Sequence, residues 1–184
     1  MILIEISKRD LMDLAKTEVR NLPGALFVGA SPLLKPFMKK LECILPAERM
    51  GRGDSYILSA LHSHIDEVHA DDEKIIVKSG DKVVTISRDE LCGMVGEKYP
   101  TTDHQRLNLP GLLFLQSSPS LQAVAASKLR REHNLRIPEG RRTMRYIFHF
   151  AVTSIDADKD KIRIAFDPDR LPKRADGTGV LEQG

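Results

Sequence analysis

A basic stretch between Lys128 and Arg145 is the most concentrated chemical feature of the sequence. It holds seven basic residues against two glutamates, a local excess of five positive charges in a chain whose formal net charge is +2. Arginine presents a planar fork of N–H donors that suits phosphate oxygens, and a basic helix followed by a basic loop is typical of a surface that follows a nucleic-acid backbone. The sequence therefore predicts an anion-binding surface built from Lys128, Arg130, Arg131, Arg136, Arg141, Arg142 and Arg145.

A second, more dilute basic group occupies the corresponding part of the first half of the chain. Its members are Lys39, Lys40, Arg49 and Arg52, and acidic residues are interspersed among them. Two such groups related by an approximate two-fold axis would flank one groove. We therefore expect a non-enzymatic binding protein, without a cofactor, whose partner is nucleic acid or an acidic protein surface. A solvated helix face is the alternative explanation of the same charges.

The histidines form a second candidate site. His62, His64 and Asp66 stand at alternate positions, so they would share one face if the segment were a strand. Two imidazoles and a carboxylate are suitable metal ligands, but adjacent positions on one strand rarely complete a coordination sphere, and no metal site is expected. In a helix, His62 and Asp66 would instead share a face with His69.

Two other functions are compatible with the sequence. The first is an enzyme with a polar site at the interface between the two halves, drawing on His62, His64, Asp66, His149 and Arg145. The second is a structural or inhibitory module that acts by protein interaction. No glycine loop for nucleotide phosphates and no motif of a catalytic nucleophile supports the enzyme, and its catalytic residues are therefore unknown.

A repeated segment organises the elements that position these residues. The stretch from Asn21 to Leu34 returns between Asn108 and Leu121 with nine of the fourteen positions identical. In both copies a Pro-Gly pair predicts a type II turn, with Gly24 and Gly111 at positive φ. A short apolar strand is expected next, and then a Ser-Pro pair that begins a helix.

Further signals of local structure also occur twice. Ser7 and Ser87 each precede a carboxylate by three residues, the spacing of a capping box at the start of a helix. The segments 55–68 and 144–155 are both predicted to be strands, because the second is rich in aromatic and β-branched residues. Ser79-Gly80-Asp81 predicts a tight hairpin that connects the two halves.

Together these signals predict an α+β fold made by tandem duplication of a β-α-β-α-β-β unit, forming one body with a pseudo-two-fold axis. The first repeat is expected to span residues 1–80, the second residues 81–166, and an extended C-terminal tail residues 167–184. Oligomers are compatible with this arrangement.

Composition favours a soluble protein. No run of eighteen or more apolar residues and no secretion leader is visible, so we expect a cytoplasmic protein that does not enter a membrane.

Overall fold

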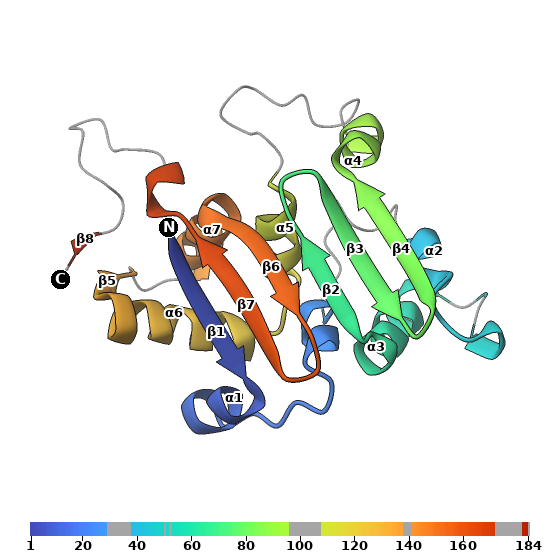
Figure 1. Cartoon of the computed structure of the whole chain (residues 1–184), viewed down its shortest axis with the longest axis horizontal. Coiled ribbons are helices and arrows are strands. Elements are labelled where there is room, and N and C mark those ends of the chain that lie inside the picture. Colours follow the sequence, from blue (N-terminus) through green and yellow to red (C-terminus); the bar gives the residue numbers. More distant parts are fainter. Residues whose placement is uncertain are drawn as a thin grey trace.

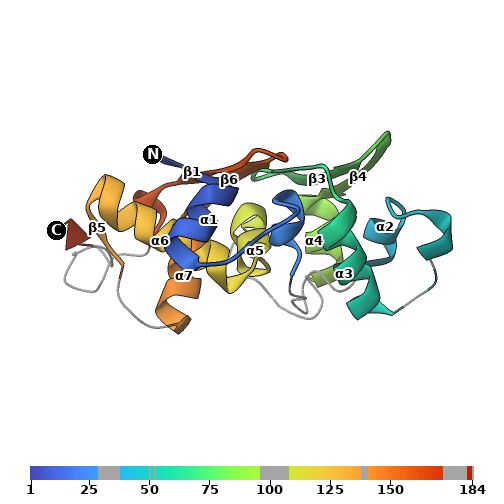
Figure 2. The same cartoon turned by 90° about the horizontal axis from the view of Figure 1, so that it is seen from below.

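A computed structural model describes residues 1–28, 38–49, 51, 53–95, 108–137, 141–171 and 182–183. The fold is a mixture of helix and sheet, which confirms the α+β prediction. A six-stranded sheet forms one layer, and the labelled helices all lie on one side of it (Figures 1 and 2). The opposite face of the sheet carries no helix among the described residues, and we call it the open face.

The sheet is antiparallel throughout, and its strand order is β1-β7-β6-β2-β3-β4. The strands are β1 (Ile2–Ser7), β2 (Glu67–Ala70), β3 (Lys74–Ser79), β4 (Lys82–Ser87), β6 (Val152–Ala157) and β7 (Lys161–Phe166). This order reads the same from either end if β1 corresponds to β4, β7 to β3 and β6 to β2. The middle of the sheet is the short β2–β6 pairing, in which His69 faces Asp156.

Alternating side chains separate the two faces of the sheet. In β1, Ile4 and Ile6 are fully buried under the helices, whereas Leu3 and Glu5 are exposed. The same alternation in the other strands builds one apolar core between sheet and helices. The open face carries mainly charged and polar side chains, with Leu3 and Val83 as exposed apolar residues of the two end strands.

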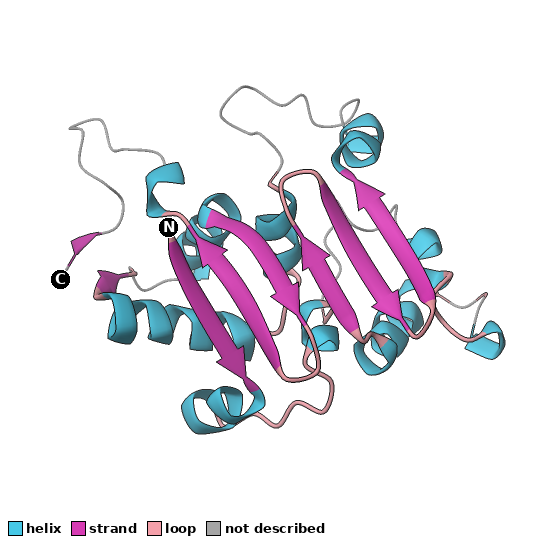
Figure 3. Ribbon diagram, viewed as in Figure 1, coloured by secondary structure: helices cyan, strands magenta, loops and turns pink. Residues whose placement is uncertain are grey.

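Seven α-helices form the second layer in the described residues (Figure 3). They are α1 (Lys8–Ala15), α2 (Met38–Glu42), α3 (Asp54–His64), α4 (Arg88–Val95), α5 (Leu109–Leu115), α6 (Pro119–His133) and α7 (Arg141–Ala151). Short 3-10 helices are η1 (Pro23–Leu26), η3 (Ala47–Arg49) and η5 (Pro168–Arg170). No described helix is both long enough and apolar enough to cross a lipid bilayer.

The predicted helix starts are confirmed. The Ser7 hydroxyl accepts a hydrogen bond from the Asp10 amide at 3.1 Å, and the Asp10 carboxylate accepts one from the Ser7 amide at 2.8 Å. Ser87 and Glu90 make the same reciprocal pair at 3.1 and 2.9 Å. Ser118 is the N-cap of α6, with proline at its first position. The equivalent Ser-Pro pair of the first copy lies outside the described residues.

The apolar segments after the two Pro-Gly pairs are helical rather than extended, which corrects the sequence prediction. They form η1 and α5, and a continuous apolar run of this length fits a buried helix as well as a buried strand. Gly24 and Gly111 also do not have the positive φ of a type II turn, since the described glycines with positive φ are Gly51 and Gly80. Gly80 lies in the predicted β3–β4 hairpin, which is confirmed.

Gly24 and Gly111 are required by a close approach of two backbones. A Cβ atom on Gly24 would lie 2.6 Å from the carbonyl carbon of His62, and one on Gly111 would lie 2.8 Å from that of His149. Each glycine therefore allows a helix, α3 or α7, to contact the segment that follows the Pro-Gly pair. The geometry depends on the missing side chain and not on a left-handed conformation.

The two segments predicted as third strands are also mostly helical. Helix α3 runs to His64 and α7 runs to Ala151, so that β2 and β6 begin only at Glu67 and Val152. The apolar residues of each segment recur at helical spacing, and packing against η1 and α5 overrides the β-rich composition. The predicted β-α-β-α-β-β order is therefore wrong at these elements.

The strand that begins each half completes the sheet of the other half. β1 pairs with β7, and α1 packs against α6. β4 pairs with β3, and the Lys40–Glu90 ion pair ties α4 to α2. At the C-terminus, β8 (Glu182–Gln183) pairs with β5 (Leu135–Arg136) in a separate two-stranded sheet.

Candidate anion-binding surface

The basic stretch forms the end of the molecule made by α6, β5 and the start of α7. Helix α6 buries Leu121, Val124 and Leu129 against the core, which directs its remaining residues outward. Asn134 takes a left-handed conformation (φ 54°) that ends the helix, and the chain turns into β5. These elements place the second half of the basic stretch around one end of the helix layer.

Four arginines of this stretch are exposed, and we call them the arginine cluster: Arg130, Arg131, Arg136 and Arg145. None of them forms an ion pair with a carboxylate within the described part of the chain. Arg130 and Arg131 lie in the last turn of α6, Arg136 in β5 and Arg145 on α7. Arg136 faces Glu182 in the β5–β8 pairing, so Arg130, Arg131 and Arg145 are the members of the cluster whose positive charge has no acidic neighbour among these ion pairs and strand pairings.

Lys128 belongs to the same stretch but is already bound within the protein. Its ammonium group lies 3.1 Å from the Asp10 carboxylate and 3.7 Å from that of Glu132, and it donates a hydrogen bond to the Glu5 carbonyl oxygen at 2.6 Å. Burial opposes ionisation of Asp10, but hydrogen bonds from Ser7 and Lys128 together lower the pKa of its carboxyl group. Lys128 thus fastens α6 to α1 and β1.

The basic residues of the first half lie at the opposite end of the molecule. Helix α2 and the arginine-bearing α6 are at the two ends of the view in Figure 1, so these basic regions do not border one groove. Lys40 is held by Glu90 at 2.7 Å, and this hydrogen bond lowers the pKa of the Glu90 carboxyl group. Lys39 is exposed and Arg49 half-buried, while Arg52 lies outside the described residues.

Arg141 and Arg142 occupy the first turn of α7. The structure describes the backbone of this turn, and the side chains of both arginines lie outside the described part of the chain.

The residues of the predicted polar enzyme site fall on separate elements. His62 and His64 lie on α3, whereas His149 and Arg145 lie on α7, and no hydrogen bond among the described residues joins the two groups. Asp66 accepts a hydrogen bond from the Gly80 amide at 2.5 Å and so supports the β3–β4 turn.

His62 lines a cavity of about 390 Å³ together with serines and apolar residues of α3 and the segment after η1. His149 is largely buried, and this burial lowers the pKa of its imidazole. Neither histidine has a carboxylate partner in the described residues. No group of three or more His, Cys, Asp or Glu suited to a metal ion occurs in that part of the chain.

Sequence reasoning did not find the pairing at the centre of the open face. The Nδ1 atom of His69 lies 2.6 Å from Oδ1 of Asp156, and its Nε2 atom lies 3.1 Å from Oδ2 of Asp71. The hydrogen bond to Asp156 raises the pKa of His69, burial opposes this, and Asp71 adds to it. Asp71 follows His69 by two residues, whereas Asp156 is far away in sequence, and the β2–β6 register brings it opposite His69.

Other cations of the open face are also neutralised by neighbours. Arg163 lies 3.3 Å from the Glu5 carboxylate and 3.8 Å from that of Asp158, and Lys161 also reaches Glu5 at 3.5 Å. A cavity of about 400 Å³ on this face therefore has a balanced lining of both signs. The arginine cluster, by contrast, lies on elements of the helix side.

Comparison of the chain with protein-family models, with curated protein sequences and with solved structures finds no match.

Proposed function

We propose that the protein binds polyanions through the arginine cluster, and that duplex nucleic acid is the class of ligand it takes. The observation that carries this proposal is that four exposed arginines without a described ion pair lie within one short stretch of the chain. Lys40, Lys128, Lys161 and Arg163 are each held by at least one carboxylate. Other basic residues that lack one in the described part of the chain, such as Lys8, Lys39 and Lys74, lie apart on α1, α2 and β3.

The chemistry of the cluster suits phosphate groups spaced along a backbone. Guanidinium groups give paired N–H donors to phosphate oxygens, and their binding releases counterions from the nucleic acid. The arginines come from the end of one helix, a short strand and a second helix, so they extend over a surface and do not converge on one point. Such a surface favours a polymer over a small anion.

We further infer that the two halves of the chain are copies of one unit. The repeated Asn-Leu-Pro-Gly sequence is accompanied by repeated contacts. The Asn21 side chain donates to the Ile65 carbonyl at 2.9 Å, and that of Asn108 donates to the Val152 carbonyl at 2.7 Å. The arginine cluster belongs to one half alone, so the binding proposed here is a property of the second copy.

The test of the binding proposal is the affinity for duplex DNA and duplex RNA, measured by fluorescence anisotropy at several salt concentrations. We expect the logarithm of the affinity to fall linearly with that of the salt concentration, by about 0.9 for each DNA phosphate neutralised. The double substitution Arg130→Glu and Arg131→Glu should lower the affinity at least about tenfold and reduce the slope by about 2.

The matched control is the double substitution Lys74→Glu and Lys159→Glu. Both lysines are exposed at strand ends or turns of the sheet, and their replacement changes the net charge by the same amount. Equal losses of affinity in both variants would show a general effect of net charge, and the cluster would then not be the binding surface. Absence of binding to either duplex at low salt would refute the proposal and make an acidic protein surface the next ligand to test.

A further inference from the structure

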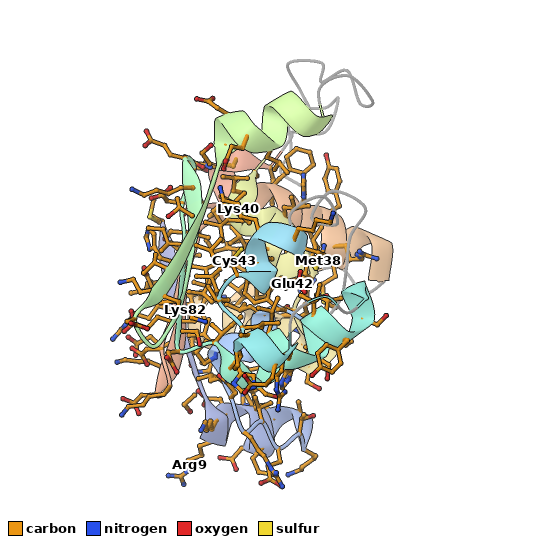
Figure 4. All side chains as sticks on the ribbon, turned by 90° about the vertical axis from the view of Figure 1, so that its right-hand side faces the viewer. Arg9, Met38, Lys40, Glu42, Cys43 and Lys82 are labelled. Atoms are coloured by element: carbon orange, nitrogen blue, oxygen red, sulfur yellow. The ribbon has the colours of Figure 1, made fainter. Side chains whose placement is uncertain are left out.

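We propose that the outer edge of β4 is a self-association surface, on which β4 of a second copy of this chain pairs antiparallel across a two-fold axis. Among the described strands, β4 stands at the end of the sheet and is hydrogen-bonded to β3 alone. Figure 4 looks at this edge, and β4 lies in front of the sheet with the nearest helix, α2, beside it in the helix layer. The proposal is independent of the polyanion site.

The direction of the main-chain groups follows from the β3–β4 hairpin. Its loop is Gly80-Asp81, and Ser79 faces Lys82 in the closing pair. In a two-residue hairpin, the two residues of the closing pair form both main-chain N–H···O=C hydrogen bonds with each other. Because this pairing alternates along an antiparallel strand, the main-chain groups of Lys82, Val84 and Ile86 bond to β3. Val83 and Thr85 therefore direct their N–H and C=O groups away from the sheet.

Ser87 provides an independent check of this alternation. Its amide donates to the Glu90 carboxylate at 2.9 Å and hence also points away from β3. The main-chain groups of Val83 and Thr85 have no protein partner in the described residues. The Val83 side chain, on the open face, is 55% exposed, which is high for a large apolar residue in a strand.

The sequence of β4 is complementary to itself in one antiparallel register. In this register Val83 faces Thr85 of the second copy, and Val84 lies on the two-fold axis. Each Val83–Thr85 pair exchanges two main-chain hydrogen bonds, and the axis generates two such pairs. The side chains of Val83 and Thr85 then lie opposite each other on the open face. Both are β-branched, and such cross-strand pairs stabilise a sheet. Lys82 faces Ile86, so the pairing opposes no like charges within the strand.

The two end strands differ in whether a lysine is bound to an outward-facing main-chain group of the strand: at β1 Lys128 is, whereas at β4 Lys82 donates to the Leu45 carbonyl oxygen instead. Leu3 occupies the place in β1 that Val83 has in β4, and it is 58% exposed. At β1, however, the Lys128 ammonium group is already hydrogen-bonded to the outward-facing Glu5 carbonyl oxygen at 2.6 Å. A lysine at a sheet edge is a common device against edge pairing. This difference assigns the association to β4 with β4, which closes as a dimer and does not propagate.

The test is sedimentation equilibrium of the full chain over a wide range of protein concentration. We expect a monomer–dimer equilibrium with the modest affinity of a small interface. The substitution Val83→Lys should raise the dissociation constant by about tenfold or more, because it places like charges next to the axis. Its control, Leu3→Lys, makes the same change at the other end strand and should leave the equilibrium unchanged.

Amide hydrogen exchange then identifies the edge that pairs. The Val83 and Thr85 amides should exchange more slowly as the concentration rises, while the Leu3 amide should not change. A monomer at every concentration, or a dimer that Val83→Lys does not weaken, overturns the proposal. Concentration-dependent protection of Leu3 together with Val83 would show head-to-tail pairing of β1 with β4, which also overturns it.

Discussion

Replacement of Gly111 by alanine tests the close approach of α5 and α7. The added Cβ atom would lie 2.8 Å from the His149 carbonyl carbon, closer still to its oxygen, and 2.9 Å from Nδ2 of Asn108. The obstructing group is backbone, so relief of the contact requires movement of α7 relative to α5. Overpacking of this kind costs about 1–3 kcal/mol.

The same movement also affects the hydrogen bonds of the Asn108 side chain. Its Nδ2 atom donates to the carbonyl oxygens of His149 at 2.6 Å and Val152 at 2.7 Å. Loss of one of these bonds in a buried place costs about 1–3 kcal/mol more. Alanine is better than glycine in a helix by about 1 kcal/mol, which offsets part of this cost. We expect a net loss of about 3 kcal/mol in the free energy of unfolding.

Thermal unfolding followed by circular dichroism measures this loss. A chain of this length changes its Tm by about 2–4 °C for each kcal/mol, so Gly111→Ala should lower the Tm by about 6–12 °C. The control is Gly93→Ala in α4, where a Cβ atom meets nothing within 4 Å. That substitution should stabilise the fold by up to about 1 kcal/mol. Similar Tm values for Gly111→Ala and the wild type would refute the role assigned to this glycine.

Two further predictions concern charged side chains. The pKa of His69 is raised by Asp156 and Asp71, so its contribution to stability is present below the unfolded pKa and is lost as the pH rises through the folded pKa. Urea denaturation should therefore show that His69→Gln is more destabilising at pH 5.5 than at pH 8.5. The difference in the free energy of unfolding should be less than about 1 kcal/mol, because solvent screens the interaction of His69 with the two aspartates. A difference of the opposite sign would contradict the stabilising role of the charged imidazole. Lys128→Ala should cost about 1–3 kcal/mol and Lys40→Ala less than about 1 kcal/mol, because the Lys128 side chain is 13% exposed and that of Lys40 39%. Equal losses in the two lysine variants would show that burial of the ammonium group does not matter here.

Local signals in the sequence predicted the parts of the fold that depend on neighbours along the chain. The capping pair of Ser7 and Asp10, the N-cap Ser118 and the hairpin at Gly80 each need contacts within a few residues, and all three are confirmed. The α+β class followed from such signals as well. Their physical cause is contained in a few consecutive residues.

Other features of the fold depend on contacts between segments that are far apart in the sequence. The positive φ predicted for Gly24 and Gly111 is wrong, and the actual reason for a glycine there, close approach to the backbone of His62 or His149, depends on the tertiary structure. The same holds for the helices α3 and α7, since short apolar segments fit either helix or strand until their packing is known. Spacing along the chain does not contain that information.

The candidate binding surface stays a prediction. Arg130, Arg131 and Arg145 are exposed, but the sequence could not show that Lys128 is held by Asp10. Charge counting treats all basic residues alike, and only the structure separates those with carboxylate neighbours from those without. The binding itself is a prediction that the anisotropy measurements will test.

The position of β1 has a consequence for synthesis on the ribosome. Ile2 pairs with Phe166, so β1 finds its neighbour only after roughly 160 further residues have been made and have left the exit tunnel. β2, β3 and β4 are consecutive in sequence and can pair long before that. At about 5–20 residues per second, synthesis of those roughly 160 residues takes about 8–30 seconds, during which the apolar side of β1, with Ile4 and Ile6, has no strand partner. During this interval the apolar strand is open to contact with chaperones that act during translation.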